Sequence, residues 1–329
     1  MHKLSWSLLI ASLLLVIAVA LAASFGTESV SWARALSDVD SVDYAILFDV
    51  RLPRIALSGL AGAGLAAVGV AFQALLRNPL AEPYVLGVSG GAALGATIVI
   101  ALGLPLTAAW ATAVVPASAM IGGLAATALV YAIARAGEGS ATSMLLAGVI
   151  VNAIASALIT FIKTLVSAAK AQDLLFWLMG FIDVPSRTTL LVVSVYVFIG
   201  CGVLVADAGR LNLLSLGDEP AQHLGVDVRK LERRVYIAAS LVVGAIVSAT
   251  GLIGFVGLVV PHALRRVLGP DHRVLLPTSL VVGATTLVLC DLLARAAFRW
   301  IGTEPPVGAV TALVGGPLFL VLLRRRAGW

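Results

Sequence analysis

Uninterrupted apolar runs of about twenty residues recur along this chain, and they constrain its fold more than any other feature. A helix needs about 20 consecutive apolar residues to cross a bilayer, whereas a barrel strand alternates polar and apolar residues over about ten positions. The charged fraction is 12%, against about 25% in a soluble domain, and 60% of the residues are hydrophobic. In lipid every backbone polar group must be bonded internally, so the sequence predicts an all-α integral membrane protein.

About ten hydrophobic segments are predicted. They lie at about 4–24, 54–76, 87–103, 108–134, 142–162, 189–206, 235–250, 255–266, 274–298 and 307–323. The eighth is short and rich in glycine, and Pro261 is expected to interrupt it, which favours a half-helix or a re-entrant element.

The basic residues predict the orientation. If the N-terminus is cytoplasmic, 14 of the 22 lysines and arginines fall on that side and 8 on the other. The positive-inside rule then places both termini in the cytoplasm. The two long connections are an external loop, 25–53, and a cytoplasmic segment, 207–234, so residues 1–329 form a single transmembrane domain. Because the basic residues lie at segment ends, the net charge of +5 indicates contact with membrane lipid and no nucleic-acid partner.

The sequence offers little for enzyme chemistry. It contains no G-x-x-x-x-G-K-[ST] motif, so a nucleotide-driven process needs an ATPase on a separate chain. The two cysteines, Cys201 and Cys290, lie inside apolar runs, and the four histidines have no metal-site spacing. We therefore predict no catalytic residue, no metal site and no cofactor.

One cytoplasmic stretch has the form of a docking element. In Leu216–Gly225 two glycines bracket one or two helical turns, and Asp218 and Glu219 lie in the first turn, where the helix dipole favours acids. An ordinary solvated connector has the same form, and local physics alone favours the connector.

An ordered series of motifs covers nearly the whole chain. They are Arg51–Arg54, Arg77–Pro83, Leu86–Ala92, Leu146–Gly148, Trp177–Gly180, Leu216–Gly225, Gly254–His262, Pro306–Ala312 and Gly316–Phe319. Together they resemble the FecCD-type permeases, the membrane subunits of importers for ferric siderophores, haem and cobalamin. The sequence departs from the family pattern at Glu304-Pro305-Pro306, where Glu-Leu-Pro is usual, and at Cys290-Asp291, where Ala-Asp is frequent.

The resemblance implies a type II ABC importer permease fold with about ten transmembrane helices per subunit. It implies a homodimer in the bacterial inner membrane, with the substrate path along the dimer axis and lined by the fifth and tenth helices. It also implies two copies of a cytoplasmic ATP-binding subunit and a periplasmic substrate-binding protein as partners. The cargo would be a bulky metal chelate, which the sequence does not name.

The resemblance also assigns residues to three sites. The ATPase-coupling residues are Leu216, Gly217, Asp218, Glu219, Ala221, Leu224 and Gly225. Arg51, Arg54 and Arg295, at the external ends of the second and ninth helices, would grip glutamates of the binding protein in exposed rim pairs. Asn78, Leu80, Thr142 and Ser143 would form a cytoplasmic gate.

Two other function classes stay open on the residues alone. A proton-coupled secondary transporter needs carboxylates along a membrane path, and Asp291 is nearly the only one. A partner for Asp291, with Arg295 one turn away, is the favoured interpretation. An intramembrane serine protease could use Ser89 of Gly87-Val88-Ser89-Gly90, but it needs a histidine base such as His262, which is predicted at the cytoplasmic end of its segment.

Overall fold

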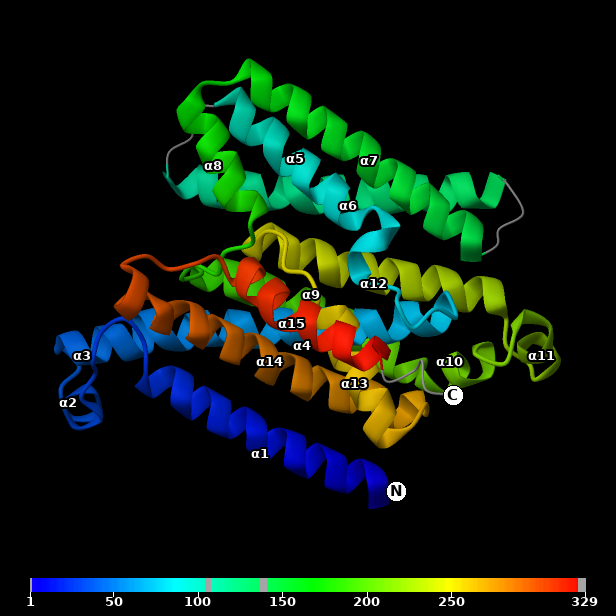
Figure 1. Ribbon diagram of the computed structural model, residues 1–329, viewed down its shortest axis with the longest axis horizontal. Coiled ribbons are helices and arrows are strands. Elements are labelled where there is room, and N and C mark those ends of the chain that lie inside the picture. The colour runs from blue at the N-terminus through cyan, green and yellow to red at the C-terminus, as the bar shows by residue number, and fades with distance from the viewer. Residues whose placement is uncertain (1, 104–107, 137–140, 325–329) are drawn as a thin grey trace.

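The computed structural model describes residues 2–103, 108–136 and 141–324, and within these ranges the regular structure is helical throughout. Figure 1 shows the arrangement. The first half of the chain forms α1 (His2–Ser24), α2 (Trp32–Ser37), α3 (Val42–Tyr44), a π-helical turn η1 (Ala45–Arg51), α4 (Leu52–Leu75), a 3₁₀ turn η2 (Pro83–Leu86), α5 (Val88–Leu102), α6 (Ala108–Ala136) and α7 (Ala141–Leu165). The second half forms α8 (Ala168–Leu178), α9 (Arg187–Ala206), α10 (Ala208–Leu214), α11 (Asp218–His223), α12 (Val228–Thr250), α13 (Val256–Leu268), α14 (His272–Ile301) and α15 (Val307–Arg324).

Seven helical stretches of the described residues are long and apolar enough to cross a membrane. They are Leu4–Ser24, Val42–Leu75, Val114–Ala134, Ser143–Leu165, Arg187–Ala206, Val228–Thr250 and His272–Ile301. Two further apolar helices are shorter, Val88–Leu102 and Val307–Val321. Each of the ten predicted segments overlaps a helix, so the multi-pass, all-helical prediction is confirmed, while ten crossings and the cytoplasmic termini stay predictions.

The helices run roughly side by side, with short helices at the two ends of the bundle (Figure 1). α4 lies at the centre, because it contacts α14, α13, α9 and α12. α1 covers the outer side of α14, and α5, α6, α7 and α8 form a separate layer that joins the rest mainly through α12. α2 and α3 lie at one end, whereas α10, α11 and the start of α1 lie at the other.

Glycine allows the central helices to touch backbone to backbone. A Cβ on Gly62 of α4 would lie 2.2 Å from the main-chain oxygen of Gly283 in α14, closer than any real side chain approaches. Lipid supplies no hydrophobic drive between helices, so this close van der Waals contact is a main source of their association. Gly62 therefore serves packing, whereas a Cβ on Gly59 would meet nothing nearer than 3.9 Å.

The break near the eighth segment differs from the prediction. The chain leaves the helical path at residues 251–255, before α13, whereas Pro261 lies inside the continuous helix. A proline removes the hydrogen bond to the carbonyl four residues earlier, here that of Gly257. That oxygen instead lies 3.5 Å from the side-chain nitrogen of Gln73 in α4, and α4 comes so close because residue 69 is glycine.

Candidate functional site

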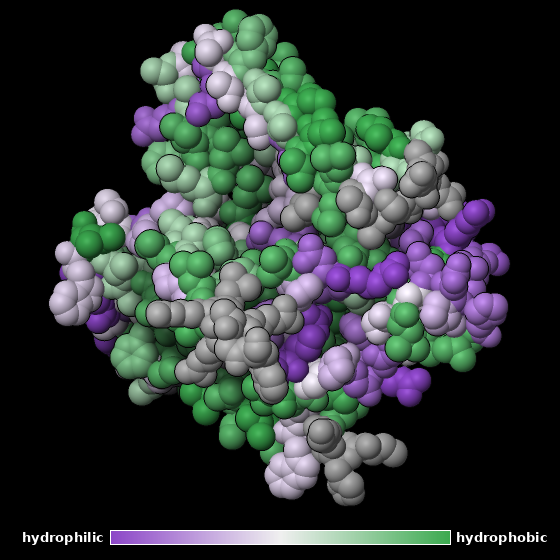
Figure 2. All heavy atoms as spheres, turned by 45° about the vertical axis from the view of Figure 1, so that its right-hand side comes forward, coloured by the Kyte–Doolittle hydropathy of each residue, from purple (hydrophilic) through white to green (hydrophobic). Residues whose placement is uncertain are grey.

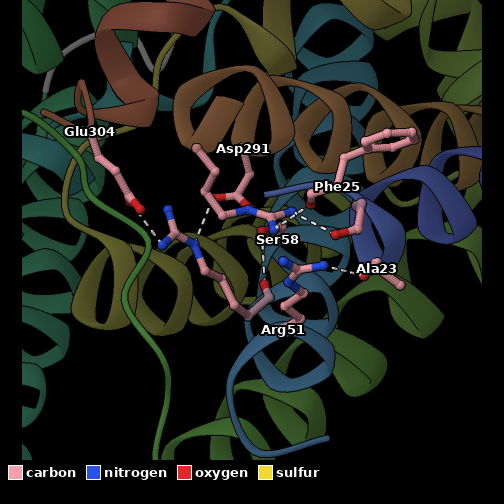
Figure 3. A network of polar contacts seen from close by, with 9 residues as sticks. Ala23, Phe25, Arg51, Ser58, Asp291 and Glu304 are labelled. Atoms are coloured by element: carbon pink, nitrogen blue, oxygen red, sulfur yellow. Dashed lines mark hydrogen bonds and ion pairs between the residues drawn. The ribbon is translucent and has the colours of Figure 1, made fainter. Parts of the chain in front are cut away.

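A buried group of charges joins three helical regions near the end of the bundle that carries α2 and α3 (Figure 3). Arg54 of α4 donates from Nε to Asp291 of α14 at 2.9 Å and from Nη1 to Glu304, just before α15, at 3.0 Å. Arg295 donates from Nε to the second oxygen of Asp291 at 3.0 Å. One carboxylate that is 0% exposed therefore serves two guanidinium groups.

The remaining donors of this network hold the end of α1. Arg295 and Arg51 both reach main-chain oxygens of the segment 22–28, where α1 ends and the following loop begins. These bonds run from Arg295 to Ala22 (3.1 Å) and Phe25 (3.2 Å), and from Arg51 to Ala23 (2.7 Å) and Glu28. Arginine suits the task, because its planar fork supplies several fixed donors.

The structure corrects the expectation that these arginines are exposed. The exposed fractions of Arg51, Arg54 and Arg295 are 4%, 8% and 4%, and their donors bond within the chain. The pairing of Asp291 with Arg295 is confirmed, but Arg54 and Glu304 were missed as partners. Binding-protein docking through the three arginines stays a prediction, and it would require a partner carboxylate to replace an internal acceptor.

A cavity of about 670 Å³ opens beside α5 and α7. It is lined by Tyr84, Ser89, Gly90, Ala93, Val149, Asn152, Ser156, Ile159, Thr160, Lys163, Leu178 and Leu252. Its size falls within the range of about 300–1,000 Å³ that is usual for small-molecule sites. The hydroxyl of Ser89 donates to the main-chain oxygen of Tyr84 at 3.4 Å, so the structure gives it a structural role in the wall and supplies no support for a protease.

Three side chains bond the backbone next to this cavity. The hydroxyl of Tyr84 donates to the main-chain oxygen of Ile253 at 2.8 Å and accepts from the N–H of the same residue at 3.0 Å. Glu82 accepts from the N–H of Phe255 at 2.7 Å. Asn152 of α7 donates to the main-chain oxygen of Tyr84 at 2.9 Å. The non-helical loop 251–255 thus has its backbone bonded by protein, as a membrane-embedded break requires.

The predicted coupling segment forms a short exposed helix at the other end of the bundle. α11 lies between Gly217, with φ +120°, and Gly225, with φ +86°, so both flanking residues use backbone conformations that glycine favours. The predicted helix between two glycines is confirmed as structure, and its coupling role stays a prediction. Leu216 and Leu224 are 63% and 58% exposed, whereas Ala221 is buried against the bundle.

Hydrophilic side chains gather at this end, which Figure 2 turns toward the viewer. Asp207 is buried and pairs with Arg210 at 2.6 Å and Arg234 at 3.2 Å. Asp227 begins α12, and the Lys230 backbone N–H and ammonium hold the pKa of this carboxyl below its usual value. α10, α11 and the start of α12 therefore form one surface rich in fixed charges.

An ion pair joins this surface to the loop that follows α4. Arg77 bonds Asp218 of α11 at 2.7 Å, with both side chains partly exposed. Arg77 also has φ +48°, which is unusual for a residue other than glycine, and it turns the chain sharply at the end of α4. Sequence reasoning placed Arg77 and Asp218 in separate motifs and missed this contact.

The four gate residues are placed only in part. Asn78 accepts from the N–H of Leu80 at 2.9 Å, and Leu80 is 45% exposed in the same loop as Arg77. Ser143 is half-buried in the first turn of α7. Thr142 lies in that turn, but its side chain is outside the described residues. A gate at these residues stays a prediction.

Comparison with known proteins identifies the family. The model of the FecCD transport family matches residues 14–325, almost the full chain. This chain belongs to the FecCD transport family. The motif resemblance is therefore confirmed.

The relatives of this FecCD member include transport permeases with different named cargoes. It is 39% identical to the hemin transport system permease HmuU of Yersinia pestis over 318 residues, covering 95% of this chain and 94% of the relative. It is 42% identical to the cobalamin import system permease BtuC of Halobacterium salinarum over 281 residues, covering 85% and 74%. A solved structure described as a metal-chelate type ABC transporter in an inward-facing conformation superimposes with a TM-score of 0.87 at 34% identity, covering 97% and 98%.

Proposed function

We propose that this protein is the membrane-spanning permease of an ABC importer that carries a bulky metal chelate inward across the bacterial inner membrane. ATP hydrolysis occurs in a partner: two copies of an ATP-binding subunit dock on the cytoplasmic end of a permease homodimer. A periplasmic substrate-binding protein delivers the cargo at the opposite end. Membership of the FecCD family and relatives named for hemin and cobalamin support this assignment.

The observation that carries the proposal is the construction around α11. Two exposed leucines flank a short helix that is fixed by glycines, and Arg77 ties this helix to the loop after α4. A partner that displaces α11 therefore acts, through this ion pair, on the loop that holds the proposed gate residues Asn78 and Leu80. An exposed ion pair adds about 0–1 kcal/mol, so this contact can form and break at low cost as α11 moves.

The test compares two exposed leucines at opposite ends of the bundle. Leu224→Asp should abolish co-purification with the partner ATPase, because it removes apolar contact area and adds charge. Leu36→Asp, in α2 and at 69% exposure, should leave the complex and its ATPase activity intact. The purified permease alone should show no ATPase activity. Cargo uptake by liposomes that contain only this chain, driven by a proton gradient, would contradict the proposal.

The charge network argues against the secondary-transporter alternative. A proton relay needs a carboxylate that can bind and release a proton along an open path. Asp291 is fully buried and bonded by Arg54 and Arg295, so its negative charge is already compensated.

A test of binding-protein docking through Arg51, Arg54 and Arg295 needs a variant that leaves the fold intact. Charge reversal at Arg51 or Arg54 would place an extra carboxylate in a buried network, so it would unfold the site as well as test docking. Glu304→Gln instead releases only one donor of Arg54. If Arg54 binds a partner carboxylate, this variant should raise the on-rate of the binding protein, and the rate should fall with salt. An unchanged on-rate would assign Arg54 to the scaffold alone.

The gate prediction is tested by crosslinking across the proposed dimer. Cysteine at Leu80, which is exposed, should crosslink between two subunits in one nucleotide state and not in another. A cysteine at Leu36, at the far end, is the matched control. Equal crosslinking at residue 80 in every state would remove the gate from this loop.

A further inference from the structure

The polar wall of the cavity beside α5 and α7 comes from one face of a single helix. Asn152, Ser156, Thr160 and Lys163 of α7 all line it, at spacings of four, four and three residues. Side chains at these spacings project from the same side of an α-helix. The other wall carries the hydroxyls of Tyr84 and Ser89, which bond main-chain oxygens of the protein, so α7 supplies most of the polar groups that a ligand can meet.

Most hydrogen-bonding groups on this face already have partners. Asn152 donates to the main-chain oxygen of Tyr84 and accepts from the N–H of Gly90. Thr160 donates its hydroxyl hydrogen to the main-chain oxygen of Ser156 at 2.9 Å. The hydroxyl of Ser156 and the ammonium of Lys163 have no bond to another described residue, so they are donors available to a ligand.

The charge of the lining has one sign. Among the lining residues that the structure describes, Lys163 is the single cation and none is a carboxylate. A lysine in the last turn of a helix often does no more than stabilise the dipole and extend to the membrane surface. The neighbouring Lys170 of α8 has a structural role, since its ammonium donates to the main-chain oxygen of Ala101. Lys163 instead lines the cavity above a row of hydroxyl groups.

We propose that this cavity binds an anionic metal complex, with an oxyanion group of the complex on Lys163 and a second acceptor on Ser156. The inference rests on the proposed importer function and names its substrate class. At 1.5 Å rise per residue, seven residues separate the two donors by about 10 Å along α7. A bulky chelate reaches both donors at once, whereas a small inorganic anion reaches one. A neutral complex such as a cyanide-capped corrinoid leaves the ammonium without a counter-charge.

The experiment uses the permease purified with its ATPase partner in nanodiscs. Binding of three probes is measured by absorbance and quenching of tryptophan fluorescence: hemin, an anionic ferric tricatecholate and neutral cyanocobalamin. The wild type should bind at least one anionic probe more tightly than cyanocobalamin. Lys163→Gln should weaken that binding at least tenfold, and Lys163→Arg, which keeps the charge, should restore it to within about threefold.

Two controls separate the ligand role from general damage. Lys170→Gln removes an equally external lysine outside the cavity and should change the affinity less than twofold. Ser156→Ala should weaken the anionic probe by a smaller factor than Lys163→Gln, because a neutral hydroxyl contributes less than an ammonium.

Each outcome decides one claim. A wild type that binds no anionic probe, or prefers cyanocobalamin, overturns the anionic class. Equal affinities for Lys163→Gln and Lys170→Gln overturn the site. If Lys163→Gln takes up cargo as well as the wild type, the importer function stands and the site falls. If lysine-dependent binding is found in a protein that neither assembles with an ATPase nor transports, the site stands and the importer function falls.

Discussion

Removing the carboxylate of Asp291 should destabilise this protein more than removing any exposed charge. Asp291 is 0% exposed and bonds Arg54 at 2.9 Å and Arg295 at 3.0 Å. In Asp291→Ala both guanidinium groups stay buried, and only Arg54 keeps a carboxylate, that of Glu304. The network then holds three arginines, counting Arg51, and one acid.

The expected magnitude follows from the burial of both partners. Breaking a buried ion pair by removing one member costs about 3–5 kcal/mol, because the other charge stays desolvated. Here one acid serves two arginines, so we expect the upper part of that range, about 4–5 kcal/mol. By contrast, Arg34→Ala removes a guanidinium that is 73% exposed; Asp43, whose side chain is 12% exposed, keeps the N–H of Ser31 as a donor, so the change should cost about 1 kcal/mol.

A triple replacement separates burial of charge from loss of packing. Arg54→Met with Asp291→Leu and Arg295→Met removes the charges together and keeps similar volumes. Well-packed apolar replacements of a buried ion group are often neutral or stabilising, so the triple variant should unfold within about 1 kcal/mol of the wild type, or later. Two losses oppose this: the bonds from Arg295 to the end of α1, and the ion pair of Arg54 with Glu304, whose side chain is 22% exposed.

The assay is reversible unfolding in mixed micelles with increasing SDS, followed by tryptophan fluorescence. The expected order of stability places the wild type and the triple variant together, Arg34→Ala slightly below, and Asp291→Ala far below. An Asp291→Ala variant as stable as Arg34→Ala would show that water reaches the network. A triple variant less stable than Asp291→Ala would show that the ion group is a net source of stability.

Three further predictions concern the backbone. Gly62→Ala should weaken α4 against α14 and lower the unfolding midpoint by several degrees, whereas Gly59→Ala, which has room for its Cβ, should not. Gly225→Ala should cost about 1–2 kcal/mol through backbone strain alone, since φ is +86° and no atom lies within 4 Å of the added Cβ. Gly202→Ala has equal space for its Cβ without a positive φ and should be neutral. Tyr84→Phe should leave a buried N–H unpaired, at about 1–3 kcal/mol, and speed hydrogen exchange in the loop between α12 and α13; unchanged exchange would show that the hydroxyl does not hold this loop.

The sequence predicted the helices well because lipid leaves few alternatives. A stretch of twenty apolar residues in a bilayer has to be helical, so composition and length were enough. The break before α13 was predicted in kind but misplaced at Pro261. Proline is a strong breaker in water, yet here Gly69 and Gln73 of α4 accommodate the carbonyl that Pro261 leaves free. That compensation comes from another helix and is invisible to a local pattern.

The charge partners were predicted only where they are near in sequence. The spacing of Asp291 and Arg295 is one helical turn, so their pairing followed from periodicity. The partners Arg54 and Asp291 are separated by 237 positions, and Arg54 and Glu304 by 250, so only the packed fold brings them together. For the same reason Arg51, Arg54 and Arg295 were interpreted as exposed. Burial beside carboxylates also explains why these arginines lie on the side that the positive-inside rule disfavours.

The charge network around Asp291, the helix α15 and the cavity beside α5 and α7 form one connected region. The contacts within this region differ in strength. Glu304 ties the start of α15 to Arg54, and the N–H of Gly308 donates to the main-chain oxygen of Gly180 at 3.0 Å, just beyond the cavity residue Leu178. The side chain of Glu304 is 22% exposed, whereas that of Asp291 is 1% exposed. Water can replace Arg54 on Glu304 at low cost, but it cannot reach Asp291. If the start of α15 moves during transport, the ion pair of Glu304 with Arg54 therefore breaks first, and the buried pairs of Asp291 keep α4 and α14 together.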